Sequence, residues 1–246
     1  MTSEWLCLGR ISEATQASPR GGDLPPIDGL IDADGRVPYE AGLEMQYELH
    51  RQVVAGERGP SLIMLEHPSV YTAGRQAKEE DRPYDGTPVV AIDRGGQLTW
   101  HGPGQLVVYL SGALRPKPDV RQFVSDLETA IIDALAEFGI QAVTVEGRPG
   151  VWLPGDERGP DRKIAALGLA IRQGATLHGI AVNCTNDPRP FAQIVPCGLK
   201  DASVTSMALE GIAGVEPVDL APVLGRKLDE VVSTWFVAAP NKEKAA

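Results

Sequence analysis

The chain has 246 residues, 43% of them hydrophobic and 23% charged, and 23 basic against 33 acidic residues give a net charge of −10. These proportions are ordinary for a globular protein and allow one large core. The negative charge disfavours nucleic acid and anionic membranes as partners, and no apolar run approaches the roughly 20 residues that a membrane-spanning helix needs.

The three cysteines are Cys7, Cys184 and Cys197, and no pair has C-x-x-C spacing. An odd number without that spacing argues against a disulfide framework or a zinc ribbon. The N-terminus lacks a basic segment followed by an apolar one, as a signal peptide would have. We therefore expect a reducing compartment, the cytoplasm.

The first half of the chain predicts short strands around one helix. The helix begins after Pro38, ends before Gly56 and contains His50, which we interpret as a surface or packing histidine. Residues 18–36 collect prolines, glycines and aspartates without periodicity, so we expect a mobile loop that adds little to the core. Residues 66–75 are expected to form a turn. Strands are predicted at residues 5–8, 61–65, 89–92, 97–100 and 105–110.

The second half predicts two long helices around a hairpin. Residues 119–138 have an aspartate in the capping position and a wide apolar face that ends at Gly139, and residues 217–236 form the last amphipathic helix. Strands are predicted at 142–145 and 151–153, and a hairpin at 163–171 and 175–182. Residues 241–246 are expected to be a disordered tail.

Strands that arrive in pairs and triples between helices lack the strict alternation of a doubly wound fold. This order predicts an α+β fold with a mixed β-sheet. With no linker in the middle of the chain, we expect residues 1–246 to form a single catalytic domain.

The segment around Cys197, IVPCG, favours a reactive thiol. Pro196 fixes its own backbone and Gly198 allows a turn, so the cysteine side chain can face a cleft. The alternative is an inert cysteine buried in a turn, which is the commoner fate of a free cysteine.

Two glycine clusters, at residues 94–96 and 101–104, follow strand ends. Neither matches the phosphate-binding patterns G-x-x-x-x-G-K-[ST] or G-x-G-x-x-G. They suit tight turns, or the walls of a narrow slot for an extended apolar chain with Arg94 and His101 at its polar mouth.

Several side chains are candidate partners for Cys197. His101 or His178 can serve as a base, and Lys163 opens an otherwise apolar strand, although it can also be an ordinary strand-end lysine. A metal site that recruits His67, His101 and His178 lacks ligand spacing, so no metal is expected. A serine hydrolase would need a G-x-S-x-G turn, which the chain does not contain.

Six blocks of sequence together resemble the lipoyl(octanoyl) transferase family. They are HPSVYTAGR at 67–75, RGGQLTWHGPGQ at 94–105, GVWL at 150–153, KIAALG at 163–168, TLHGIAVN at 176–183 and IVPCG at 194–198. They follow the family's order between about residues 38 and 236. The resemblance implies the fold of the biotin ligase and lipoate ligase catalytic domains. The sequence departs from the family pattern in the segment 18–36, which resembles an insertion, and in a longer loop at 156–161.

The resemblance also implies site residues. Cys197 would form an acyl-thioester and Lys163 would be the proton-transfer partner. Backbone N–H groups near Gly198 or His178 would hold the oxyanion. The positions that match the family's acyl-binding residues are Arg94, Gly95, Gly96, Gln97, Leu98, Thr99, Trp100, His101, Ala166, Leu167, Gly168, Gly179, Ile180 and Ala181.

The implied reaction is octanoyl (or lipoyl) transfer, without a cofactor, from octanoyl-acyl carrier protein to a lysine of a lipoyl-accepting domain. Acceptors would be the lipoyl domains of 2-oxoacid dehydrogenase complexes and the glycine cleavage H protein. The alternative enzyme is an ATP-dependent lipoate or biotin ligase of the same fold, which would use Lys163 but has no use for Cys197. A non-catalytic acyl-binding module is a further alternative, against which Cys197 and Lys163 together argue.

Overall fold

The computed structural model describes residues 3–12, 29–83, 87–194 and 202–238. Its helices are α1 (Tyr39–Val54), α2 (Val120–Ala136) and α3 (Pro217–Trp235), with short 3-10 turns at Glu79–Asp81 and Arg189–Gln193. The strands are β1 (Glu4–Cys7), β2 (Ser61–Leu65), β3 (Val70–Ala73), β4 (Val89–Ala91), β5 (Leu98–His101), β6 (Gln105–Ser111), β7 (Val143–Val145), β8 (Arg148–Leu153), β9 (Arg162–Arg172), β10 (Ala175–Asn183) and β11 (Ser203–Val204).

The large sheet has the order β1-β2-β6-β10-β9-β8-β7, and β11 pairs with β9 beside this path. β1 runs parallel to β2 and β11 parallel to β9, whereas the other neighbours are antiparallel. The β9–β10 hairpin closes on Gln173 and Gly174, both with positive φ, which suits a tight two-residue hairpin turn. The α+β fold with a mixed sheet, predicted from the order of elements, is confirmed.

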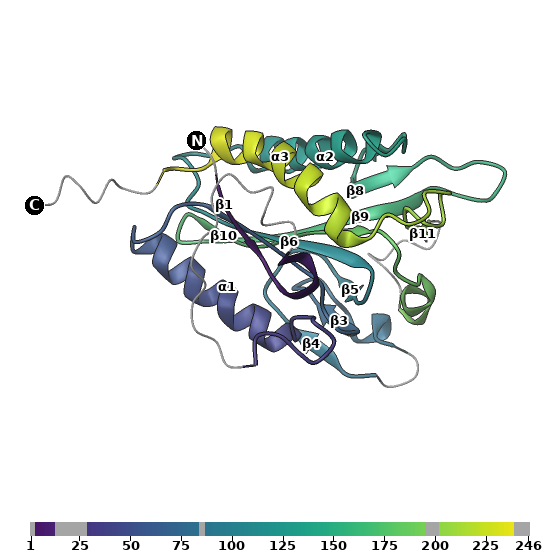
Figure 1. The fold of residues 1–246 in the computed structure, drawn as a ribbon, viewed down its shortest axis with the longest axis horizontal. Coiled ribbons are helices and arrows are strands. Elements are labelled where there is room, and N and C mark those ends of the chain that lie inside the picture. The colour runs from purple at the N-terminus through teal and green to yellow at the C-terminus, as the bar shows by residue number, and fades with distance from the viewer. Residues whose placement is uncertain (1–2, 13–28, 84–86, 195–201, 239–246) are drawn as a thin grey trace, which may run out of the picture.

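Helices cover both faces of this sheet (Figure 1). α1 lies on one face against β6 and β10, and α2 and α3 lie together on the other. Phe123, Leu127 and Ile131 of α2 and Leu224 and Leu228 of α3 are fully buried, at the four-residue spacing that places side chains on one helical stripe. Asp119 caps α2 by accepting hydrogen bonds from the backbone N–H groups of residues 121 and 122.

A second, smaller sheet has the order β4-β3-β5. Its apolar side chains Tyr71, Leu98 and Trp100 form a cluster with Phe191 and Ile194. Trp100 and Phe191 meet edge to face, with ring centroids 5.4 Å apart. This cluster fixes the described end of the chain just before residue 195.

Two strands were missed by sequence reasoning. β3 lies inside residues 66–75, which we expected to be a turn, because Pro68 and Gly74 surround only four strand residues. β11 is only two residues long, so it carries no period. Both strands depend on partners distant in sequence, β4 and β5 for β3 and β9 for β11.

Residues 29–36, the described end of the segment 18–36, contain turns but no helix or strand. Leu30 packs partly against the cluster under α1, and the carbonyl of Gly35 accepts a hydrogen bond from the backbone N–H of Arg10. None of residues 29–36 is buried, so this end adds to the core only through the partial packing of Leu30. Residues 18–28 and the tail 241–246 lie outside the described residues.

At Gly225, α3 packs closely against Trp5 of β1. A Cβ at this position would lie 2.6 Å from Cη2 and 2.7 Å from Cζ2 of Trp5. Alanine favours a helix over glycine by about 1 kcal/mol, yet this overpacking should dominate, so Gly225→Ala should destabilise the protein by about 1–3 kcal/mol in urea unfolding. Adding Trp5→Phe, which removes both atoms, should recover part of the loss that the glycine change causes. A stabilising Gly225→Ala would contradict the packing argument.

Candidate active site

The candidate site is a narrow cavity between the β9–β10 hairpin, β5 and the start of α1. Twelve of the fourteen predicted acyl-binding residues line it, and Gly95 and Trp100 do not. The sequence prediction missed Tyr39, Val107 and Tyr109, which also line it. The full lining is Tyr39, Arg94, Gly96, Gln97, Leu98, Thr99, His101, Val107, Tyr109, Ala166, Leu167, Gly168, His178, Gly179, Ile180 and Ala181.

The register of the hairpin explains how distant segments meet here. Ala166 pairs with Ala181 and Gly168 with Gly179 across β9 and β10. A Cβ on Gly168 would lie 2.9 Å from Cδ of Arg94, so glycine is what allows the arginine to cross the strand. Small residues on paired strands therefore leave the space that larger side chains would fill.

Arg94 is part of the wall. It is 7% exposed, and its guanidinium donates to the carbonyl and the hydroxyl of Thr72, at 2.8 and 3.0 Å, and to the carbonyl of Gly95. His101 is buried as well. The expectation that these two residues form an open polar mouth is wrong, because their polar atoms are turned toward protein partners.

Histidines and tyrosines close one side of the cavity. Tyr39 stacks on His101 with ring centroids 6.1 Å apart. The Nδ1–H of His67 donates to the carbonyl of Val37, so Nε2 accepts from the hydroxyl of Tyr109. Burial lowers the pKa of His67 to about 4 and, with the charge of nearby His67, the pKa of His101 to about 3. Both rings are therefore neutral at pH 7.

His178 has positive φ, +61°, and its Nε2 lies 2.9 Å from Oδ1 of Asp93. Burial lowers its pKa, although the Asp93 carboxylate opposes that effect. Its backbone N–H donates to Oε1 of Gln46 at 2.9 Å. The backbone N–H of His178 is therefore already engaged, so the structure does not support the expectation that it donates a hydrogen bond to the oxyanion.

Lys163 lies at the start of β9 and is 8% exposed. Its Nζ donates to the carbonyl of Pro149 at 3.0 Å and sits 4.5 Å from the centre of the Trp152 ring. Val204 of β11 lies opposite it in register. Lys163 is therefore held inside the protein, not in water as a strand-end lysine would be.

A second, smaller cavity includes Lys163 in its lining. The two share Thr99, Ala166 and Ala181, and the smaller is also lined by Gln105, Lys163, Asn183, Phe191 and Val204. Phe191 and Val204 lie close in sequence to the two described ends that border residues 195–201. Cys197 itself lies outside the described residues, so its position is not part of this geometry.

The other cysteines are placed differently. Cys184 is fully buried, and burial raises the pKa of its thiol. Cys7 lies in β1 and packs against the main core. Among the described residues, no group of three or more His, Cys, Asp or Glu side chains is arranged to hold a metal ion.

Residues 38–227 match the family described as the lipoyl protein ligase A/B catalytic domain. The chain is 50% identical over 184 residues to an octanoyltransferase of Paenarthrobacter aurescens, which covers 75% of this chain and 83% of that one. It is also 50% identical to an octanoyltransferase of Salinispora tropica, covering 83% and 96% of the two chains. The chain belongs to the octanoyltransferase family.

A solved structure of a bipartite lipoate protein ligase from Thermoplasma acidophilum superposes with a TM-score of 0.59 at 16% identity. The match covers 77% of this octanoyltransferase and 80% of that chain. At this identity the likeness concerns the fold alone, and it confirms the lipoate ligase fold that the sequence motifs implied.

The buried histidines make the stability of the protein depend on pH. A histidine of an unfolded chain has a pKa of about 6.5, and the folded values of His67 and His101 are about 4 and about 3. The unfolded state thus binds more protons below pH 6.5, so the free energy of unfolding should fall as pH drops from 7 to 5. The slope should approach about 1.4 kcal/mol per pH unit for each histidine.

Urea unfolding at pH 5, 6 and 7 measures this slope. His67→Gln should reduce the slope by the share of one histidine, whatever it does to stability at pH 7. An unchanged slope in this variant would show that His67 binds protons equally in the folded and unfolded states, so that burial does not lower its pKa.

Proposed function

We propose that this octanoyltransferase carries its acyl group as a thioester of Cys197. The donor is octanoyl-acyl carrier protein. The acceptor is the lysine of a lipoyl-accepting domain, of the kind found in 2-oxoacid dehydrogenase complexes and in the glycine cleavage H protein. We further propose that residues 1–246 work as one catalytic domain in the cytoplasm, where thiols stay reduced.

One observation carries the proposal. Lys163 is buried, lines the smaller cavity and lies opposite β11, and β11 begins two residues after position 201. The described ends on either side of the Cys197 segment therefore lie close in sequence to Phe191 and Val204, which line the smaller cavity together with Lys163, the only lysine of the described residues that lines either cavity. A thiol needs a nearby base or cation to react, and Lys163 is placed to be one.

The chemistry consists of two acyl transfers. The sulfur of Cys197 attacks the donor thioester carbonyl, a new thioester forms, and the pantetheine thiol leaves with the proton taken from Cys197. The acceptor amine then attacks the enzyme thioester, an amide forms, and the proton lost by the amine returns to the Cys197 sulfur. Lys163 relays both protons. No ATP or cofactor is consumed.

The cavity suits an octanoyl chain. The strands β9 and β10 contribute Ala166, Leu167, Gly168, Gly179 and Ile180 to its lining, all apolar or without a side chain. Its polar lining groups are largely neutral or paired, as for His101, which meets Oε1 of Gln105 at 2.8 Å. An extended acyl chain therefore loses contact with water without meeting an unpaired charge from these groups.

The alternatives have less support. His101 and His178 have lowered pKa values, chiefly through burial, which makes them weak bases, and His178 is directed to Asp93. A lipoate protein ligase shares the fold at 16% identity, whereas the two relatives at 50% identity are octanoyltransferases. A ligase also gives no role to the Cys197 segment.

Intact-protein mass spectrometry tests the thioester. Incubation with octanoyl-acyl carrier protein and no ATP should add one octanoyl group, which hydroxylamine removes and which Cys197→Ala abolishes. Cys184→Ala is the matched control and should still acylate, since the thiol of Cys184 is fully buried and its pKa is raised. An adduct on Cys7 or Cys184, or one that requires ATP, would overturn the mechanism.

Lys163→Arg separates a proton relay from a fixed charge. Arginine keeps a positive charge but does not give up a proton near neutral pH, so overall transfer should fall by about 100-fold to 10,000-fold. The measurement is steady-state transfer to the acceptor lysine, followed from pH 6 to pH 9. Near wild-type transfer by this variant, or loss of transfer only in His101 and His178 variants, would assign the base to a histidine.

A further inference from the structure

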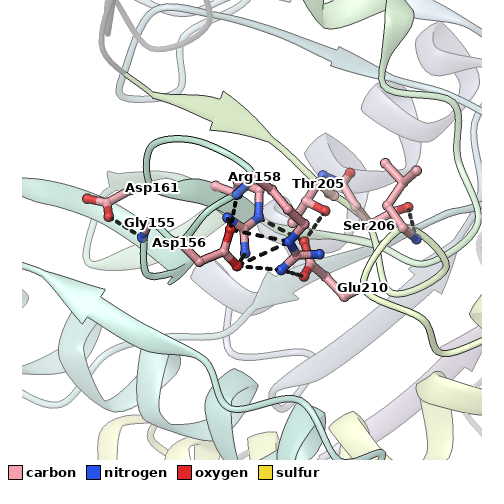
Figure 2. A network of polar contacts seen from close by, with 10 residues as sticks. Gly155, Asp156, Arg158, Asp161, Thr205, Ser206 and Glu210 are labelled. Carbon is pink, nitrogen blue, oxygen red and sulfur yellow. Dashed lines mark hydrogen bonds and ion pairs between the residues drawn. The ribbon is translucent and has the colours of Figure 1, made fainter.

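Glu210 is a buried carboxylate close to the site but outside both cavities. Its side chain is 5% exposed and accepts hydrogen bonds on both oxygens (Figure 2). Oε1 accepts from the hydroxyl of Thr205 at 2.6 Å and from Nε of Arg162 at 3.0 Å, and Oε2 accepts from the guanidinium of Arg158 at 2.8 Å. Glu210 thus joins three residues from two separate segments.

Both arginines belong to the segment that leads into Lys163. Arg162 is its immediate neighbour and its side chain is only 10% exposed. Asp156 binds the same two guanidinium groups, with Oδ2 at 3.0 Å from Arg162 and 2.7 Å from Arg158. Two carboxylates therefore balance two arginines, and Asp156 and Arg158 of the loop at 156–161 are tied to the start of β9.

Thr205 belongs to the segment that follows residues 195–201. The backbone N–H of Ser203 donates to the carbonyl of Asp161, and that of Thr205 donates to the carbonyl of Lys163, both at 3.0 Å. The carbonyl of Thr205 accepts from the side chain of Asn183 at 2.8 Å. A two-residue strand has few backbone bonds of its own, so the side-chain bonds of Asn183 and Glu210 to Thr205 add to the backbone bonds that hold β11 against β9.

The pKa of Glu210 agrees with its hydrogen bonds. Burial by itself raises the pKa of the carboxyl group, but hydrogen bonds from Thr205, Arg162 and Arg158 outweigh burial and the net pKa is lowered. The group is therefore ionised at neutral pH and accepts every bond described above.

We propose that Glu210 is a positioning residue for the acyl-transfer reaction, because it clamps β11, where the described chain resumes after residue 201, to the start of β9 beside Lys163. The inference rests on the proposed function of Cys197 and Lys163. Glu210 itself touches neither cavity, so it acts through Thr205 and Arg162. Misplacement of reacting groups by about 1 Å can reduce a rate by about 100-fold.

The test compares Glu210→Ala with Thr205→Val and Asp229→Ala. Thr205→Val removes one donor to Glu210 at nearly constant volume, and it tests the same clamp if Glu210→Ala fails to fold. Asp229→Ala is the matched control, since Asp229 accepts a backbone hydrogen bond from Ser3 at 3.0 Å, on α3 and away from the site. The folded fraction of each variant is measured by circular dichroism before kinetics.

Three readouts are compared in the full-length enzyme: kcat, KM for octanoyl-acyl carrier protein, and the pH midpoint of Cys197 alkylation by iodoacetamide. Glu210→Ala should lower kcat by about 10-fold to 100-fold with KM within about 3-fold, and should move the midpoint to higher pH. Thr205→Val should lower kcat by a few-fold and should also move the midpoint of alkylation to higher pH. Asp229→Ala should leave kcat and the midpoint unchanged.

Folded Glu210→Ala and Thr205→Val variants with wild-type kcat and midpoint would overturn the positioning role alone. So would a fall in activity that tracks only the folded fraction, as a purely structural role predicts. If the wild-type enzyme forms no adduct at Cys197, the proposed function fails and the positioning role fails with it. If the wild-type enzyme forms the adduct and the variants are unaffected, only the positioning role fails and the proposed function stands.

Discussion

The backbone hydrogen bonds of β9 are the constraint on which the rest of this site depends. β9 pairs with β10 along most of its length, with β8 near its start and with β11 at residues 162 and 163. The same strand thus carries Lys163 at one end and the floor of the cavity in its middle. Because a strand alternates its faces at every residue, a shift of one residue would turn these side chains away from the cavity.

Polar groups in and around the wall of the cavity are directed largely toward protein partners. His67 and His101 have lowered pKa values and remain neutral, and Arg94 donates its hydrogen bonds to backbone and hydroxyl oxygens beside the cavity. An unpaired charge in this wall would disfavour an apolar chain and destabilise the fold. The same buried groups that suit an octanoyl chain therefore also make folding sensitive to acid.

Charged groups gather instead at the start of β9. Arg158, Arg162, Asp156 and Glu210 form a balanced network there, and none of the four lines either cavity. Pairing of this kind lets Arg162 lie largely buried beside Lys163, since removal of its partners would leave a buried charge uncompensated. The loop at 156–161 supplies half of this network.

The local pattern of the sequence determined much of the fold. Helical spacing placed α1, α2 and α3 within a few residues, and apolar runs placed β2 and the β9–β10 hairpin. The motif blocks also identified twelve residues of the cavity, although without their register. These features depend on neighbours in the chain, so a short window of sequence is enough to predict them.

Tertiary structure alone decided the partnerships. Glu210 lies 48 residues from Arg162 and His178 lies 85 residues from Asp93, and no spacing in the chain indicates either pair. The hydrogen bond from Arg94 to Thr72 and the two-residue strand β11 are likewise invisible in sequence. The reason is physical: such contacts form only when separate segments pack against one sheet, and their strength comes from the burial that packing creates.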